Sequence, residues 1–101
     1  MYDGDTITVD IDLGFNIWWR EVSLRLYGID TPEIRGEERE SGLLSRQFVL
    51  DRLPIGCEVV IETFKDKKEK YGRYLANVFY DGGKNLNLEL LQNNLAKKYE
   101  V

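Results

Sequence analysis

The residues that could carry chemistry lie in three short turns and at one strand position. The turns are Asp3-Gly4-Asp5-Thr6, Asp30-Thr31-Pro32-Glu33 and Tyr71-Gly72-Arg73, and Arg25 lies between the first two. Each turn alone is typical of an ordinary strand end. Together they offer carboxylates, which bind hard cations and activate water, and guanidinium groups, which bind phosphate in a planar fork. A cation and two carboxylates within residues 25–33 are costly to hold together unless something binds there.

The absence of histidine narrows the possible chemistry. The chain has no histidine and one cysteine, Cys57, which argues against zinc sites and against Ser-His-Asp or Cys-His nucleophiles. Cys57 cannot form an internal disulfide, and we expect it to fill the core or a strand. Any catalysis must therefore use carboxylates, Arg, Lys, Tyr or a metal held by oxygen. Sites built from oxygen ligands alone suit Ca²⁺ or Mg²⁺.

Length and composition predict one domain that covers residues 1–101. Hydrophobic residues make up 43% of the chain and charged residues 32%, which allows one modest core. The net charge of −4 argues against strong non-specific nucleic-acid binding, although the Lys65–Arg73 segment is locally basic and would suit a polyanion. No apolar run is long enough to span a membrane, and the start does not resemble a signal peptide.

Periodic patterns predict the elements that position these turns. Thr6–Asp12 alternates strictly between apolar and polar residues, which is typical of a half-buried strand. The other expected elements are strands at 17–27, 57–65 and 74–80, a short fifth strand at 86, a helix at 41–53 and a helix that starts near 87. We expect Asn87 to cap the last helix, Asn94 to end it, and Trp18 and Trp19 to pad one end of the barrel. This order predicts a mainly β protein with helices, an α+β fold built on a five-stranded OB-fold barrel.

Four pieces of the sequence, taken in order, resemble the staphylococcal nuclease (thermonuclease) family over nearly the whole chain. They are residues 3–6, 25–33 and 70–76, and Asn87 with Leu95-Ala96-Lys97. The resemblance implies a Ca²⁺-dependent phosphodiesterase, an endo- or exonuclease on DNA and RNA that breaks the 5′ P–O bond and leaves 3′-phosphates. Compared with the family, the loop after Glu33 is shorter, the first strand begins late at Met1 and a final helix is missing, so we expect a domain truncated at both ends.

The resemblance also implies a role for each residue of the turns. Asp5 and Asp30 correspond to carboxylate ligands of one Ca²⁺ ion, with Mg²⁺ less favoured, and Thr31 to a ligand through its backbone carbonyl. Glu33 corresponds to the residue that positions or deprotonates the attacking water. The other implied roles belong to Arg25 and Arg73 as the catalytic pair on the phosphate, to Asp3 as a support behind the metal ligands, and to Lys70, Tyr71 and Tyr99 as substrate-binding residues.

Two other classes of function remain open at this point. One is a non-catalytic OB-type module that binds nucleic acid or protein; such family members typically lose the metal and arginine residues, which this chain keeps. The other is a structural fragment whose strands happen to end in acidic turns. For the nuclease we expect a DNA or RNA substrate, no membrane contact and a monomer. Family members are often secreted or surface-anchored, and the sequence leaves the compartment of this chain unknown.

Overall fold

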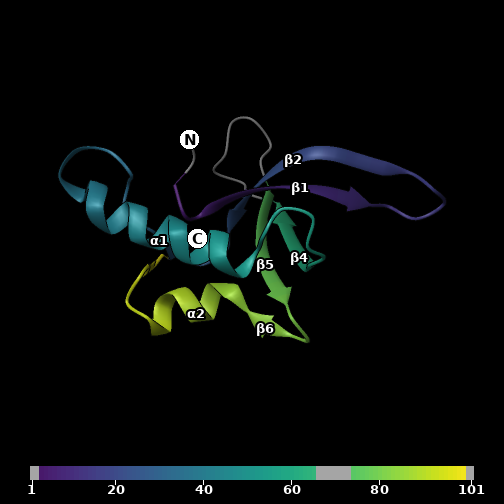
Figure 1. The fold of residues 1–101 in the computed structure, drawn as a ribbon. Helices are drawn as coiled ribbons and strands as arrows, with labels where there is room; N and C mark the ends of the chain where they lie inside the picture. The colour runs from purple at the N-terminus through teal and green to yellow at the C-terminus, as the bar shows by residue number, and fades with distance from the viewer. Residues whose placement is uncertain (1–2, 66–73, 100–101) are drawn as a thin grey trace.

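The structure, a computed structural model, describes residues 3–65 and 74–99 and consists of short strands with two α-helices (Figure 1). The strands are β1 (Thr6–Asp12), β2 (Trp18–Leu26), β3 (Ile29–Asp30), β4 (Val60–Lys65), β5 (Tyr74–Tyr80), β6 (Lys84–Asn85) and β7 (Lys97–Lys98). The helices are the 3-10 turn η1 (Gly36–Glu38), α1 (Arg39–Arg52) and α2 (Leu86–Gln92). None of the helices in these two ranges is long and apolar enough to cross a membrane.

The strands form one mixed sheet and one small ladder. The sheet has the order β1-β2-β5-β4, and β6 pairs with the C-terminal end of β5. β2 and β5 run parallel, whereas the other neighbours run antiparallel. β3 and β7 form a separate antiparallel pair, Ile29 with Lys98 and Asp30 with Lys97. The predicted class of strands with helices in an OB-like arrangement is confirmed.

A register shift in the first hairpin decides which residues meet the first acidic turn. Near the hairpin tip Ile11 pairs with Trp19, but below the shift Thr6 pairs with Arg25. Glu21 adopts a left-handed φ of 55°, and its N–H donates to the Asp10 carboxylate at 2.9 Å. This bond lowers the pKa of Asp10. The extra residue in β2 therefore sets the register in which Arg25 pairs with Thr6, the last residue of the turn that contains Asp5.

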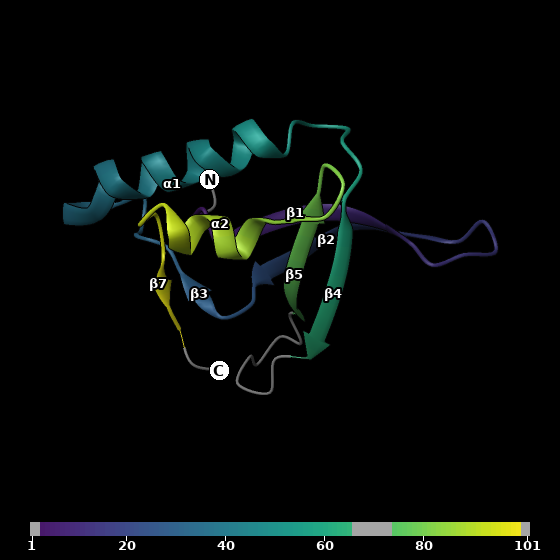
Figure 2. The ribbon, with the colours of Figure 1, turned by 90° about the horizontal axis from the view of Figure 1, so that it is seen from below.

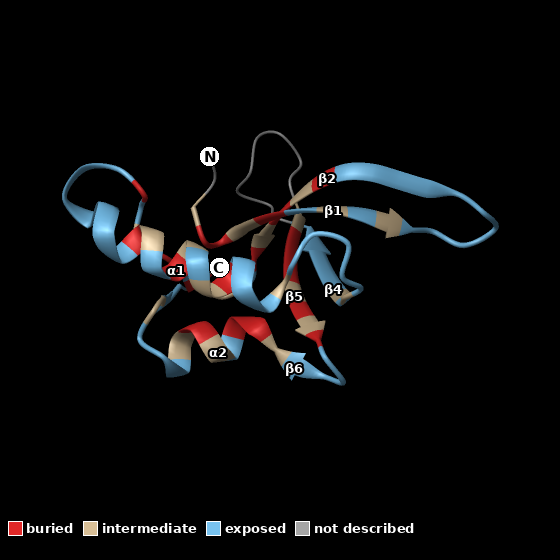
Figure 3. Ribbon diagram, viewed as in Figure 1, coloured by how far each residue is buried: buried red, intermediate tan, exposed pale blue. Residues whose placement is uncertain are grey.

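The core lies between one face of the sheet and the two α-helices (Figure 2). Apolar side chains at alternate positions of β2 and β5 point to this face, as the period of a strand requires. The most buried residues of the core are Leu24, Leu26, Ala76, Val78, Leu86 and Leu90, each 0% exposed. Figure 3 shows the buried residues gathered where α1 and α2 meet the strands, while the far end of the β1–β2 hairpin is exposed.

Three expectations about single residues are wrong. Cys57 is an exposed residue before β4 rather than strand filler, because the strand begins at Val60. Trp18 and Trp19 are each about half exposed on the projecting hairpin and do not pad a closed barrel end. α2 begins at Leu86 and is capped by Asn85, whose side chain accepts the Leu88 N–H, so Asn87 is not the cap. Asn94, as predicted, has a left-handed φ of 58° after the helix.

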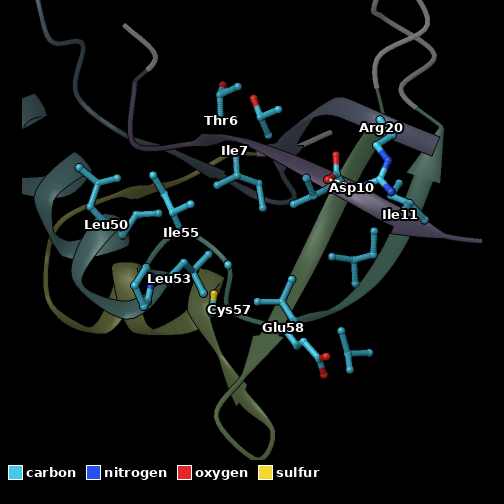
Figure 4. A pocket seen from close by; sticks show the side chains of 18 of the residues that line it. Thr6, Ile7, Asp10, Ile11, Arg20, Leu50, Leu53, Ile55, Cys57 and Glu58 are labelled. Carbon is cyan, nitrogen blue, oxygen red and sulfur yellow. Dashed lines mark hydrogen bonds and ion pairs between the residues drawn. The ribbon is translucent and has the colours of Figure 1, made fainter. Parts of the chain in front are cut away.

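Closure of the five strands into a barrel is not seen in the described residues. β1 and β4 lie at opposite ends of the strand order, and no pairing joins them. Between them lies a groove of about 1150 Å³, lined by residues of β1, by the end of α1 and by residues 54–61 (Figure 4). Of the predicted site residues that the structure describes, only Asp3 lines this groove. The candidate site lies elsewhere, at the ends of β1, β2 and β3.

Candidate active site

The first turn delivers Asp5 to the end of β2. The Thr6 N–H donates to the Asp3 carbonyl at 3.1 Å, which closes the turn, and the Leu26 N–H donates to the Asp5 carbonyl at 2.7 Å. Asp5 is only 4% exposed. A buried carboxylate in this position needs partners, because its charge loses the solvation of water.

Arg25 supplies one of those partners and joins the first two turns. Its Nη2 atom lies 3.7 Å from Asp5 Oδ2 and 3.2 Å from Asp30 Oδ1. The Asp5 side chain is 6% exposed and the Asp30 side chain 53%, so one carboxylate is interior and the other opens to solvent. Because both contact the same nitrogen, the two predicted metal ligands do converge, from turns that are 25 residues apart in the sequence.

Thr31 contacts Asp5 through its backbone and also carries a buried hydroxyl group. Its N–H donates to Asp5 Oδ2 at 3.3 Å. Its hydroxyl oxygen is buried and has no hydrogen-bond partner within the described residues. Burial raises the pKa of Asp5 above its usual value, although Arg25 and the Thr31 N–H oppose that rise. The site thus contains a buried carboxylate whose charge is only partly compensated.

The donor set fits a hard cation better than a transition metal. Asp5, Asp30 and Thr31 offer only oxygen atoms, which suits Ca²⁺ or Mg²⁺. Across residues 3–65 and 74–99, no group of three or more His, Cys, Asp or Glu could hold a metal ion, so any site here must combine two carboxylates with carbonyl or water oxygens. A cation between Asp5 and Asp30 would compete with Arg25 for the same two carboxylates.

Glu33 lies in an exposed loop that is fixed through its backbone. The Glu33 N–H donates to Glu38 Oε2 at 3.0 Å, and the Ile34 N–H donates to Asp3 Oδ1 at 3.1 Å. Ile34 itself is buried, which anchors the loop to the body of the protein. Asp3 therefore supports the loop that carries Glu33, through the residue that directly follows the Asp30-Thr31-Pro32-Glu33 turn.

The chain end brings Tyr99 to the same place. Its N–H donates to the Gly28 carbonyl at 2.9 Å, and its ring lies beside Arg25, with the guanidinium carbon 5.2 Å from the ring centroid. A guanidinium over an aromatic face is attracted to the ring. Tyr99, predicted as a substrate-binding residue, is thus a neighbour of Arg25.

The third turn cannot be placed in the same way. Lys70, Tyr71 and Arg73 lie outside the described residues. Their described neighbour Tyr74 pairs with Leu24, the residue before Arg25, and also with Lys65.

Sequence reasoning did not foresee the contacts that two residues, Asn87 and Gly42, make with the strands and the loop of the candidate site. Asn87 is buried and bonds to Tyr27, Ala76 and Val78, so it connects α2 to the residue after β2 and to the middle of β5. Gly42 lies inside α1 against the backbone of Glu33. The signal for Gly42 was a glycine within a helical pattern, which is costly unless packing requires it. No pattern signal distinguishes a buried asparagine from a capping one.

Comparison with known proteins gives one family and several relatives. The family model of the staphylococcal nuclease homologues matches residues 23–101. The uncharacterized protein MJ1439 of Methanocaldococcus jannaschii is 30% identical, over 96% of this chain and 55% of its own length. Thermonuclease of Staphylococcus hyicus is 30% identical, over 95% of this chain and 51% of its own. Endonuclease YhcR of Bacillus subtilis is 28% identical, over 98% of this chain and 8% of its own. The chain thus spans about half the length of the first two relatives and a small part of the third.

Proposed function

We propose, from the premise that the chain belongs to the staphylococcal nuclease family, that it is a Ca²⁺-dependent nuclease of DNA or RNA. The observation that carries the proposal is the convergence of Asp5 and Asp30 on one nitrogen of Arg25. The buried hydroxyl of Thr31, the residue after Asp30, has no hydrogen-bond partner in the part of the chain that the structure describes. Carboxylates next to a guanidinium can hold a cation and a phosphate side by side. That pairing is what phosphodiester hydrolysis needs.

Asp5, Asp30 and the backbone carbonyl of Thr31 would hold the Ca²⁺ ion. When bound, the ion supplies positive charge that offsets the negative charge of the phosphate. Two carboxylates and a carbonyl would leave the rest of the coordination shell to water and substrate oxygens. The raised pKa of Asp5 supports this role, because a buried carboxylate whose charge is only partly compensated gains most from a nearby cation.

Arg25 would bind the phosphate when Asp5 and Asp30 hold the cation and no longer pair with the guanidinium. Its guanidinium offers two parallel N–H donors, which match phosphate oxygens in a way that lysine does not. The side chain is 22% exposed, so a substrate can reach it. Arg73, proposed from the sequence as its partner, would share the charge that develops on the phosphate, and Lys70, Tyr71 and Tyr99 would contact the nucleotide.

Glu33 would act on the attacking water. Its exposed carboxylate would accept the proton as the water oxygen bonds to phosphorus, and the bond between phosphorus and the 5′ oxygen would break. The 5′ oxygen leaves as a hydroxyl after it takes a proton, and the phosphate stays on the 3′ side. A positioned general base contributes roughly a hundred- to ten-thousand-fold in rate.

Cleavage of a fluorescent single-stranded DNA oligonucleotide tests the proposal. We expect cleavage to 3′-phosphate products with Ca²⁺ and none with EDTA. Glu33→Ser should lose roughly a hundredfold or more in rate while it keeps much of the Ca²⁺ affinity, and Asp5→Ala should lose the Ca²⁺ affinity. Glu37→Ser, which removes an exposed carboxylate from the same loop, is the matched control.

Two results would contradict the assignment. If Glu33→Ser cleaved as fast as the control variant, the role of Glu33 would be wrong. If the protein bound the oligonucleotide tightly in a mobility-shift assay without turnover, the chain would be a binding module instead.

A further inference from the structure

Gly42 occupies a position in α1 where glycine is unfavourable for the helix itself. It is buried in the first half of a 14-residue helix. Glycine inside a helix is less favourable than alanine, because its backbone loses more conformational freedom on folding. A glycine here therefore needs a reason outside the helix.

The reason lies in the backbone that carries Glu33. A Cβ atom added to Gly42 would lie 2.5 Å from the Glu33 carbonyl carbon and 2.8 Å from the Ile34 nitrogen, and it would also overlap the Glu33 carbonyl oxygen. Ordinary contact begins at about 3.4 Å. All three atoms belong to the main chain, so no flexible side chain could turn aside. The peptide would have to retreat by roughly 1 Å or the helix would have to shift.

Two hydrogen bonds also hold the backbone on the two sides of Glu33, one at the Glu33–Ile34 peptide and one at the peptide before it. The Glu33 N–H donates to the Glu38 carboxylate and the Ile34 N–H to the Asp3 carboxylate. With Gly42 beneath the carbonyl, the backbone on both sides of the Glu33 α-carbon is fixed. The Glu33 side chain is exposed, so its backbone decides where its carboxylate can reach.

We propose that Gly42 is a positioning residue for Glu33, because the missing side chain lets the Glu33–Ile34 peptide rest on α1. The inference depends on the proposed function for its catalytic meaning. A displacement of about 1 Å at a catalytic group can cost roughly a hundredfold in rate. Gly42→Ala should therefore lower kcat by roughly ten- to a hundredfold, with much smaller changes in KM and Ca²⁺ affinity.

The kinetic test compares Gly42→Ala with Ser41→Ala, a neighbouring exposed position on the same helix. Both substitutions are made in the natural chain and in the Glu33→Ser background. If Gly42 acts through Glu33, Gly42→Ala lowers kcat only in the natural chain, whereas Ser41→Ala leaves kcat unchanged in both. An equal loss of kcat in both backgrounds, or no loss in either, would overturn the proposal.

A second measurement does not require activity and separates this inference from the proposed function. Amide hydrogen exchange at Ile34 reports the bond to Asp3, and Gly42→Ala should speed it by roughly tenfold or more. If the natural chain cleaves no nucleic acid, the proposed function fails, yet the displacement is still measured here. Unchanged exchange at Ile34 would overturn the displacement itself.

A third variant covers the case in which Gly42→Ala does not fold. The exposed Glu38 side chain accepts the Glu33 N–H. Glu38→Ala removes this acceptor, whereas Glu38→Gln keeps a side-chain oxygen that can still accept. Glu38→Ala should lower kcat in the natural chain but not in the Glu33→Ser background, and Glu38→Gln should lower it less. A loss of kcat that persists in the Glu33→Ser background would rule out positioning through the backbone of Glu33.

Discussion

Replacement of Asn87 by alanine should destabilise the protein far more than an exposed asparagine would suggest. Asn87 is 4% exposed, and its amide donates to the Tyr27 carbonyl at 2.9 Å and to the Ala76 carbonyl at 3.1 Å. Its oxygen accepts the Val78 N–H at 3.1 Å. One side chain therefore satisfies main-chain groups of β5 and of the residue that follows β2.

The magnitude follows from which groups lose every partner. Ala76 keeps a bond, because the Tyr27 N–H also donates to its carbonyl at 2.8 Å. Among the described residues, the Val78 N–H and the Tyr27 carbonyl lose the partner that Asn87 supplies, each at a cost of roughly 1–3 kcal/mol. We expect Asn87→Ala to lower the free energy of unfolding by about 3 kcal/mol or more. For a domain of this size that corresponds to a fall in Tm of roughly 12–24 °C.

Urea unfolding followed by circular dichroism measures the change, with Asn93→Ala as the control. Asn93 donates its side-chain amide to the Glu89 carbonyl at 2.8 Å in an exposed position. Its loss should change the free energy of unfolding by no more than about 0.5 kcal/mol. If Asn87→Ala lost as little as Asn93→Ala, the reasoning that Asn87 is the shared partner of these strands would be refuted.

Two further predictions concern the carboxylate and guanidinium pair. Because burial raises the pKa of Asp5 in the folded state, the stability it contributes without metal is fully present below its unfolded value of 3.8 and is lost as the pH rises through the folded pKa. Without Ca²⁺, the free energy of unfolding of Asp5→Asn should therefore increase relative to that of the natural chain as the pH rises from about 3 to 7. A difference between the two that does not depend on pH would contradict this. Arg25→Lys should lower kcat/KM on the oligonucleotide by roughly tenfold or more, because lysine lacks the planar fork, while circular dichroism shows the fold retained. Activity of Arg25→Lys within about threefold of the natural chain would argue against a bidentate phosphate contact.

Much of the fold follows from pattern because strict periodicity leaves few choices. The alternation in residues 6–12 predicted β1 at its observed bounds, and the strand expected at 74–80 matches β5. The start of α2 was harder to predict, because Asn85 and Asn87 are two residues apart and either could cap the helix. The Asn87 side chain instead bonds main-chain groups of β5, and this contact is visible only in the tertiary structure.

The site was predictable in its residue types but not in its register. From the pairing at the hairpin tip, Ile11 with Trp19, an unbroken ladder would set Arg25 opposite Asp5. The shift beside Asp10 moves Arg25 opposite Thr6 instead, and a shift of one residue exchanges the faces of a strand. Alternation of side chains does not reveal such a bulge, because the Asp10 carboxylate that stabilises it resembles any exposed acid.

A crystal structure with Ca²⁺ and a nucleoside 3′,5′-bisphosphate tests the central claim most directly, because it places the cation and the phosphate together. The account predicts one ion held by the carboxylates of Asp5 and Asp30 and the carbonyl of Thr31, with Arg25 turned from both carboxylates to the phosphate. An ion bound elsewhere, or Arg25 still bridging Asp5 and Asp30 with the nucleotide present, would contradict it.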